Sequence, residues 1–212
     1  MRFIEDYDGY YVDKKHGDEC SERVIYLTFD AGYENGNIGR ILDTLKEKGV
    51  PAAFFILANL VKTNTELVKR MVDEGHIVCN HTASHRDMTK LSDDEFAAEL
   101  ARMEKLYSDL TGHEIAKYYR PPEGKFSEAN LKKAKELGYK TIFWSFAYAD
   151  WDNNKQPDPE RAIKLIIDNA HNGEIMLLHP TSKTNADILG RVIDELRAQG
   201  YSFGSLDQLT AG

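Results

Sequence analysis

The chain has 212 residues, of which 42% are apolar, and it carries a formal net charge of −8 with a pI near 5.4. This length and composition predict one globular domain with a single large core and exclude a disordered chain. The acidic balance argues against a nucleic-acid partner. No apolar run is long enough to cross a bilayer, and no basic amphipathic stretch indicates binding to a membrane surface. The first residues lack the apolar region of a signal peptide.

Residues 1–21 are polar and rich in tyrosine, so we interpret them as an N-terminal arm packed on a domain at 22–212. In that domain, short apolar runs alternate with amphipathic stretches. The apolar runs predict strands at 24–29, 52–57, 77–80, 117–119, 141–145, 174–178 and 201–204. The amphipathic stretches predict helices at about 36–48, 64–74, 92–111, 127–137, 159–171 and 185–199. Ser92 with Glu95 predicts a capping box, and Asn64 predicts a weaker cap.

This alternation predicts an α/β fold with a mainly parallel sheet, either open or closed. About seven strands fit a small or incomplete (β/α) barrel, and a doubly wound sheet is the alternative. The two cysteines, Cys20 and Cys79, allow at most one disulfide. Cys79 ends an apolar run and is expected to be a buried thiol.

Reactive side chains fall where the predicted strands end. Asp30 follows the first strand, His81 and His85 follow the third, Arg120 follows the fourth and His179 follows the sixth. Because active sites of parallel β/α folds form at the carboxyl ends of the strands, these side chains are expected to meet at one rim. For Asp30 alone, the alternative is a cap on the following helix.

The sharpest local signal is the run from His81 to His85. Two histidines four residues apart share one face of a helical turn and are close enough to bind one metal ion. Neutral imidazoles suit zinc, while cobalt and nickel are acceptable. The alternative is a pair of loop histidines bonded to the backbone.

His179 lies at the end of an apolar run, where it is either a satisfied core residue or, as we favour, a general acid. Arg120 begins a rigid Pro-containing loop, and its guanidinium can hold the Asp30 carboxylate at two points. A surface salt bridge is the alternative. The aromatic residues near the end of the fifth strand fit either the core or a wall beside a sugar: Trp144, Tyr148 and Trp151.

Five ordered motifs resemble those of the NodB-type polysaccharide deacetylases, carbohydrate esterase family 4. They are Thr28-Phe29-Asp30-x-Gly32, His81-Thr-x-x-His85, Arg120-x-Pro122-x-Gly124, Asp150-Trp151 and Leu178-His179. The resemblance covers roughly residues 22–210. Within the family, the sequence is most similar to the spore-cortex peptidoglycan deacetylases, in the runs Thr-Phe-Asp-x-Gly-Tyr-Glu-Asn-Gly and Arg-Pro-Pro-x-Gly-x-Phe-Ser-Glu.

The resemblance implies a distorted (β/α) barrel and metal-assisted removal of an acetyl group from an N-acetylated sugar. It implies that Asp30 is the catalytic base, that His179 is the general acid and that Arg120 orients the base. It places the metal on His81 and His85. Substrate contacts are expected from Tyr119, Pro122, Trp151 and Leu178.

Two positions depart from the family pattern. The second Asp that usually completes the metal triad is replaced by Ala31, as in the spore-cortex subset. An Asp that often tunes the acid histidine is replaced by Ala147. The loss of a carboxylate ligand should weaken metal binding and make any bound ion a stronger Lewis acid. Asp30, water or substrate is then expected at the empty position.

We therefore expect a peptidoglycan N-deacetylase that acts on N-acetylglucosamine or N-acetylmuramic acid, with chitin oligomers less favoured. A water activated by Asp30 or the metal attacks the acetyl carbonyl, a backbone N–H near Tyr119 or Ala31 stabilises the oxyanion, and His179 protonates the leaving amine. One alternative is a catalytically silent glycan-binding module on the same scaffold. Another is a metal-dependent hydrolase of small non-sugar amides.

A peptidoglycan substrate implies an extracellular or cell-wall location. An export signal or membrane anchor is then expected upstream of this sequence.

Overall fold

The computed structural model describes residues 2–17 and 20–211 of the chain. Its strands are β1 (Gly9–Tyr10), β2 (Arg23–Ala31), β3 (Ala53–Ile56), β4 (Ile77–Asn80), β5 (Ala116–Tyr119), β6 (Lys140–Ile142), β7 (Glu174–Leu178) and β8 (Tyr201–Gly204). Its α-helices are α1 (Ile38–Lys48), α2 (Ala58–Thr63), α3 (Thr65–Asp73), α4 (Asp93–Thr111), α5 (Glu128–Glu136), α6 (Pro159–Asn169), α7 (Lys183–Ala198) and α8 (Leu206–Thr210). Short 3-10 helices are η1 (Arg2–Tyr7), η2 (Met88–Lys90) and η3 (Pro122–Gly124).

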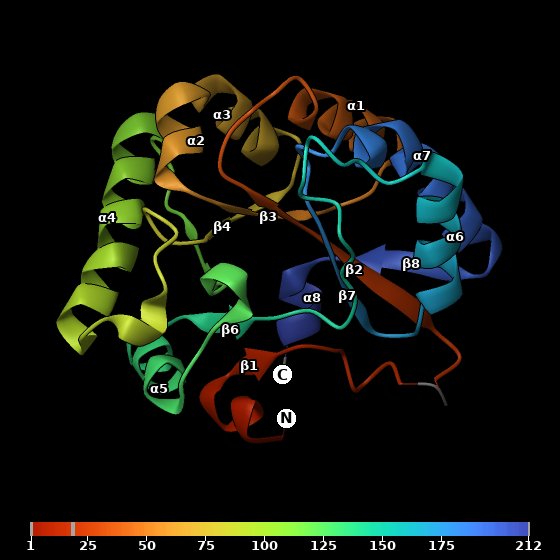
Figure 1. Cartoon of the computed structure of the whole chain (residues 1–212). Coiled ribbons are helices and arrows are strands. Elements are labelled where there is room, and N and C mark those ends of the chain that lie inside the picture. The colour runs from red at the N-terminus through yellow and green to blue at the C-terminus, as the bar shows by residue number, and fades with distance from the viewer. Residues whose placement is uncertain (1, 18–19, 212) are drawn as a thin grey trace.

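One sheet runs through the molecule in the order β1-β6-β5-β4-β3-β2-β7, and β8 pairs with β2 beside this path. The ladders between the named strands are parallel, and the long helices lie around the outside of the sheet (Figure 1). A single parallel bridge between Phe146 and Met176 connects the segment after β6 to β7. The expected incomplete (β/α) barrel is thus confirmed.

The predicted strands and long helices are all present, with small differences in their bounds. β6 ends at Ile142 rather than 145, because the chain then leaves β5 and bonds to β7 through Phe146. The short elements β1, α2 and α8 were not predicted. The capping box of Ser92 and Glu95 is confirmed, whereas the predicted cap at Asn64 is wrong because its side chain makes no capping hydrogen bond.

The N-terminal segment is attached to the sheet. Strand β1 pairs with β6, and the buried carboxylate of Asp13 accepts a hydrogen bond of 2.6 Å from the Tyr26 hydroxyl on β2. Both cysteines are free thiols, and Cys79 is buried as expected. Within the described ranges, none of the helices has the length and apolar character needed to cross a membrane.

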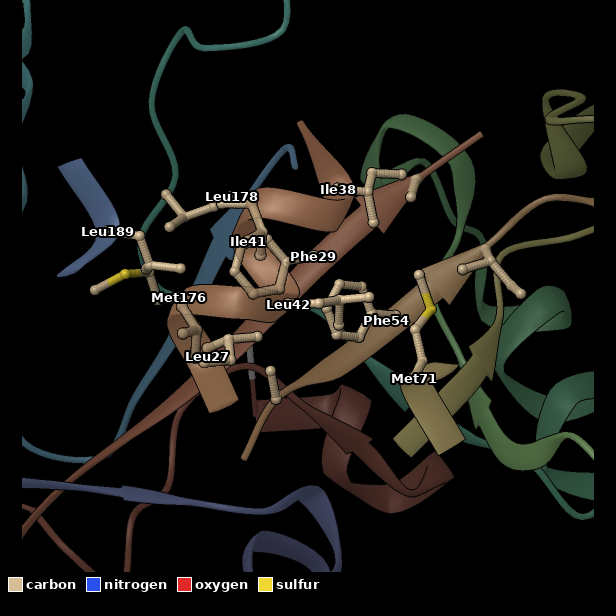
Figure 2. Close-up of a cluster of buried hydrophobic side chains, with 14 of the residues drawn as sticks. Leu27, Phe29, Ile38, Ile41, Leu42, Phe54, Met71, Met176, Leu178 and Leu189 are labelled. Carbon is tan, nitrogen blue, oxygen red and sulfur yellow. The ribbon is translucent and has the colours of Figure 1, made fainter. Parts of the chain in front are cut away.

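The alternation of side chains along β2 explains how one strand serves both core and site. Leu27, Phe29 and Ala31 belong to the main apolar cluster between the sheet and the helices. Figure 2 shows Phe29 beside Phe54 of β3, under side chains of α1, and the two rings stack with their centroids 5.1 Å apart. The intervening residues Thr28 and Asp30 point to the opposite face of the sheet, because successive side chains in a strand alternate. An apolar strand thereby holds a carboxylate rigidly at its end.

Candidate active site

Four strands bring polar side chains to the carboxyl-terminal edge of the sheet. Asp30 is the penultimate residue of β2, and His81, Arg120 and His179 directly follow β4, β5 and β7. Because these strands are parallel, their ends share one edge, as the sequence predicted.

Arg120 is fully buried and joins several strands through its guanidinium. Nη1 donates to Asp30 Oδ1 and to Thr28 Oγ1, each at 2.9 Å. Nε and Nη2 donate to the backbone carbonyls of Ile142 and Phe143 at 3.0 and 2.9 Å. A buried guanidinium needs such partners, since unpaired donors away from water are costly. The pair with Asp30 is therefore a fixed part of the interior and not a surface salt bridge.

The Asp30 side chain is 10% exposed, so its carboxylate is mostly buried and can still contact a ligand. Burial raises its pKa, but the charges of Arg120, His81 and His179 and the hydrogen bond from Arg120 lower the pKa more, to below its usual value. The carboxylate is thus ionised at neutral pH, which is the form that a general base requires.

Asp150 holds the imidazole of His179. Its Oδ1 lies 2.7 Å from His179 Nδ1, and its Oδ2 accepts the backbone N–H of His179 at 2.8 Å. Since a carboxylate accepts, Nδ1 carries a proton and Nε2 remains for chemistry. Burial lowers the pKa of His179, but the hydrogen bond and charge of Asp150, helped by Asp30, raise that pKa above its usual value. An imidazole that keeps its proton near neutral pH suits a general acid.

The replacement at Ala147 does not leave His179 without a carboxylate partner. Ala147 is exposed, and Asp150, three residues later, supplies the carboxylate from a fully buried position. The Asp150-Trp151 motif was visible in the sequence, but the role of its first residue was not.

His81 and His85 do not lie on a helical turn as predicted. Thr82 and His85 have positive φ angles of 76° and 56°, which non-glycine residues rarely adopt. Buried Asn80 fixes this loop, because its side chain accepts the N–H of Thr82 at 2.9 Å, and Thr82 Oγ1 accepts the N–H of His85 at 2.9 Å. The two imidazole rings are nevertheless neighbours, with centroids 5.0 Å apart.

Two imidazoles, of the donor type that zinc accepts, lie on this loop. His81 Nδ1 lies 2.8 Å from the Arg120 carbonyl oxygen, so Nδ1 carries the proton and Nε2 offers its lone pair, an arrangement common among metal ligands. That Nε2 is 3.6 Å from Asp30 Oδ2, and His85 lies beside it. Ala31 is buried and offers no donor. Across the part of the chain that the structure describes, no cluster of three or more His, Cys, Asp or Glu side chains is arranged to hold a metal.

Asp30 does not cap the following helix. Asn37 is the N-cap residue of α1 but makes no capping hydrogen bond with its side chain, and Glu34 has that role instead, since its carboxylate accepts the N–H groups of Gly36, Ile38 and Gly39 at 2.7, 3.0 and 3.1 Å. The first turn of α1 is thereby satisfied, and Asp30 is left to the site.

The four residues expected to contact substrate are placed differently. The Trp151 residue is 61% exposed, and its ring centroid lies 6.3 Å from that of His179. Pro122 is buried in η3, and Leu178 is buried in the main core. Tyr119 is buried against Phe96, and its hydroxyl has no hydrogen-bond partner. Trp151 can therefore form a wall of the site, whereas the other three side chains are buried and do not reach a ligand from where they lie.

Two amide side chains near the site were not singled out from the sequence. Asn185 donates to Asp150 Oδ2 at 2.7 Å. Gln156 donates to the carbonyl of Asp150 at 3.0 Å, and its own oxygen accepts from the Ser182 hydroxyl at 2.7 Å. Such amides are common on surfaces and helices, and they have no fixed spacing to the residues that they support.

Comparison with known proteins gives the family. A profile described as polysaccharide deacetylase matches residues 17–142. The chain is 44% identical over 206 residues to the peptidoglycan-N-acetylmuramic acid deacetylase PdaA of Bacillus subtilis, and the match covers 97% of this chain and 76% of that protein. The chain belongs to the polysaccharide deacetylase family. This family comprises amide hydrolases that act on N-acetyl sugars and are in general metal-dependent.

Solved structures of polysaccharide deacetylases share the fold. That of Bacillus subtilis PdaA, a family 4 carbohydrate esterase, superposes with a TM-score of 0.92 at 43% identity, over 98% of this chain and 87% of that chain. A family 4 pseudoenzyme from Bacillus anthracis gives a TM-score of 0.84 at 30% identity, over 95% and 68% of the two chains. A peptidoglycan-N-acetylglucosamine deacetylase of Bacillus cereus is 31% identical, over 89% of each chain.

Proposed function

We propose that this chain is a peptidoglycan N-deacetylase, which hydrolyses the acetamide of N-acetylmuramic acid or N-acetylglucosamine to a free amino sugar and acetate. The observation that carries the proposal is the presence of two pairs at one edge of the sheet, each anchored by a fully buried residue: Arg120 holds Asp30, and Asp150 holds His179. One pair lowers the pKa of a carboxylate below its usual value, and the other raises the pKa of an imidazole above its usual value. A base that activates water and an acid that protonates the leaving amine are the two proton-transfer roles that amide hydrolysis offers.

In the proposed reaction, Asp30 removes a proton from water while the water oxygen bonds to the acetyl carbonyl carbon. Arg120 holds one carboxylate oxygen in place during this step. His179 then gives the proton on Nε2 to the sugar nitrogen, the C–N bond breaks and acetate leaves. A backbone N–H near Tyr119 or Ala31 is the proposed donor to the oxyanion.

His81 and His85 are the residues that we propose to hold a divalent ion, with zinc favoured by neutral imidazole ligands. When bound, such an ion polarises a carbonyl oxygen and lowers the pKa of water. Arg120 orients His81 for this role through its backbone carbonyl. Because Ala31 supplies no third ligand, we expect the affinity to be low.

Two exposed aromatic rings support a sugar substrate. Tyr33 is 43% exposed and its hydroxyl accepts a hydrogen bond of 2.5 Å from Asn153, so the loop after β2 contacts the loop that carries Trp151. Apolar ring faces with polar tips suit the faces of sugar rings. A peptidoglycan strand as the partner places the action of this protein in the cell wall.

The deciding experiment measures acetate release from peptidoglycan glycan strands after chelation, with and without added zinc. Zinc-dependent release supports the deacetylase and its metal, whereas metal-independent release supports the deacetylase and contradicts the role of the metal.

Glycan binding without release supports the silent module, which the buried Ala31 and the similarity to a pseudoenzyme favour. Release from small acetylated amines but not from glycan supports the small-amide hydrolase. Unchanged release by Asp30→Asn contradicts the assignment of the base.

A further inference from the structure

Asn185 is a buried residue in the first turn of α7, only 1% exposed. Its Nδ2 lies 2.7 Å from Asp150 Oδ2 and 3.0 Å from the backbone carbonyl oxygen of His179. Its Oδ1 accepts a hydrogen bond from the Tyr148 hydroxyl. One neutral side chain therefore contacts both members of the pair that forms the proposed general acid.

The helix does not need this side chain for its own start. Ser182 is the N-cap of α7, and its hydroxyl accepts the backbone N–H of Asn185 at 3.0 Å. The Asn185 side chain points its polar atoms to Asp150, His179 and Tyr148 instead. Burying a polar amide is costly, and the start of the helix does not require this one. The contacts of Asn185 with Asp150 and His179 therefore need another explanation.

The geometry explains what the amide does for Asp150. Oδ2 accepts two N–H groups, from Asn185 and from the backbone of His179, at 2.7 and 2.8 Å. These two bonds prevent the carboxylate from rotating, so Oδ1 stays against His179 Nδ1. An amide achieves this without adding a charge, whereas an acidic residue at 185 would repel Asp150.

We infer that Asn185 is a positioning residue for the general acid, which acts through Asp150 to keep the His179 imidazole oriented and protonated. This inference rests on the proposed deacetylation. The charged groups that act on His179 are Asp150, Asp30 and Arg120, and Trp151 lies beside its ring. Replacing Asn185 by alanine leaves all of these in the sequence and removes from the pair only the two hydrogen bonds of its amide nitrogen, to Asp150 Oδ2 and to the His179 backbone carbonyl.

The test is the pH dependence of kcat/KM for acetate release by Asn185→Ala. We expect kcat to fall about tenfold while KM stays within about twofold, because only the proton transfer is impaired. We expect the alkaline limb, where His179 loses its proton, to move down by roughly half a pH unit. Tyr148→Phe removes the partner of the Asn185 oxygen and should give a smaller change in the same direction.

Asn130→Ala is the matched control. Asn130 is also a buried helical asparagine, 8% exposed, and donates to a backbone carbonyl at 3.3 Å, but it lies on α5 away from His179. It should lose stability and keep the alkaline limb of the wild-type protein. If Asn185→Ala behaves like Asn130→Ala, or changes nothing, Asn185 is merely structural and the inference is wrong. If Asn185→Ala does not fold, an unchanged profile for Tyr148→Phe has the same consequence.

A second measurement separates this inference from the proposed function. NMR titration of His179 in the wild type, Asn185→Ala and Asn130→Ala needs no turnover. A lower pKa of His179 in Asn185→Ala alone supports the positioning role, and equal values in all three contradict it. The absence of acetate release by the wild type contradicts the deacetylase itself, whatever the titration shows.

Discussion

Both carboxylate oxygens of Asp150 accept a hydrogen bond from His179, one from the ring Nδ1 at 2.7 Å and one from the backbone N–H at 2.8 Å. Asp150 is fully buried, while the His179 side chain is 28% exposed. The contact thus connects the interior to the edge of the sheet, where a leaving amine would need a proton. One hydrogen bond orients the imidazole and the other fixes the backbone that carries it, while the Asp150 carboxylate raises the pKa of the ring.

Replacing this carboxylate by an amide tests its effect on the acid. Burial lowers the pKa of His179, and Asp150 more than offsets this, so the net pKa lies above the usual value. An acid works while protonated, so activity is present below that pKa and is lost as the pH rises through it. Asp150→Asn should shift the alkaline limb of kcat/KM to lower pH and reduce kcat about tenfold or more at pH 8. An alkaline limb equal to that of the wild type would contradict the role of Asp150.

The buried guanidinium of Arg120 gives a prediction on both stability and activity. Arg120→Met leaves the Asp30 carboxylate without its partner and should cost about 3–5 kcal/mol of unfolding free energy, because a buried charge is left uncompensated. Acetate release should be lost in the same variant. Urea unfolding measures the first effect. Arg40→Met is the control, because it removes an exposed pair with Asp187 and should change the unfolding free energy by less than about 1 kcal/mol. Equal losses of unfolding free energy in the two variants would contradict the stabilising role of the buried Arg120 pair.

The sequence was sufficient to predict the rim of the site because strand ends and reactive residues coincide. Asp30, His81, Arg120 and His179 each terminate a run of apolar residues, and parallel strands bring such ends together whatever their separation in the chain. The pairing of Arg120 with Asp30 was anticipated on the chemistry of guanidinium and carboxylate alone. The expected two-point hold was wrong, because one guanidinium nitrogen bonds one carboxylate oxygen and the other donors go to the backbone carbonyls of Ile142 and Phe143. The long helices were likewise visible from their period and caps.

The parts that were missed depend on tertiary contacts. The loop from His81 to His85 takes left-handed angles because the buried side chain of Asn80 imposes them, and nothing in the local spacing indicates this. Asp150 reaches His179 only because the segment after β6 crosses to β7. The two-residue strand β1 has no periodicity to detect.

The position of Ala31 leads to a prediction about metal binding. Ala31 is buried at the end of β2, so Ala31→Asp should destabilise the metal-free protein by about 1–3 kcal/mol through an unpaired buried carboxylate. If His81 and His85 bind zinc, the new carboxylate adds a third ligand and excess zinc should restore the lost stability by binding the folded state. Thermal unfolding with chelator and with zinc measures both effects.

Ala31→Asn is the control for that experiment, since it has the same shape without the charge. It should lose stability and recover little of it with zinc. Recovery to the same extent in both variants, or in neither, would contradict a zinc site at the two histidines.

Glu174, at the start of β7, predicts a pH dependence of stability that is independent of catalysis. The residue is fully buried, Oε1 has no hydrogen-bond partner and Oε2 accepts the backbone N–H of His171 at 3.2 Å. Burial outweighs this hydrogen bond and raises the pKa to about 8 from the model-compound value of 4.5. Between those two pH values the folded state holds a proton that the unfolded chain has released, so the stability that this group contributes falls as the pH rises.

Glu174→Gln removes the titration and should be more stable than the wild type by about 1–3 kcal/mol at pH 8, with little difference near pH 4.5. Urea unfolding at both pH values, with exposed Glu160→Gln as the control, measures this difference; a gain of the same size at both would show that the carboxyl group does not take up a proton on folding.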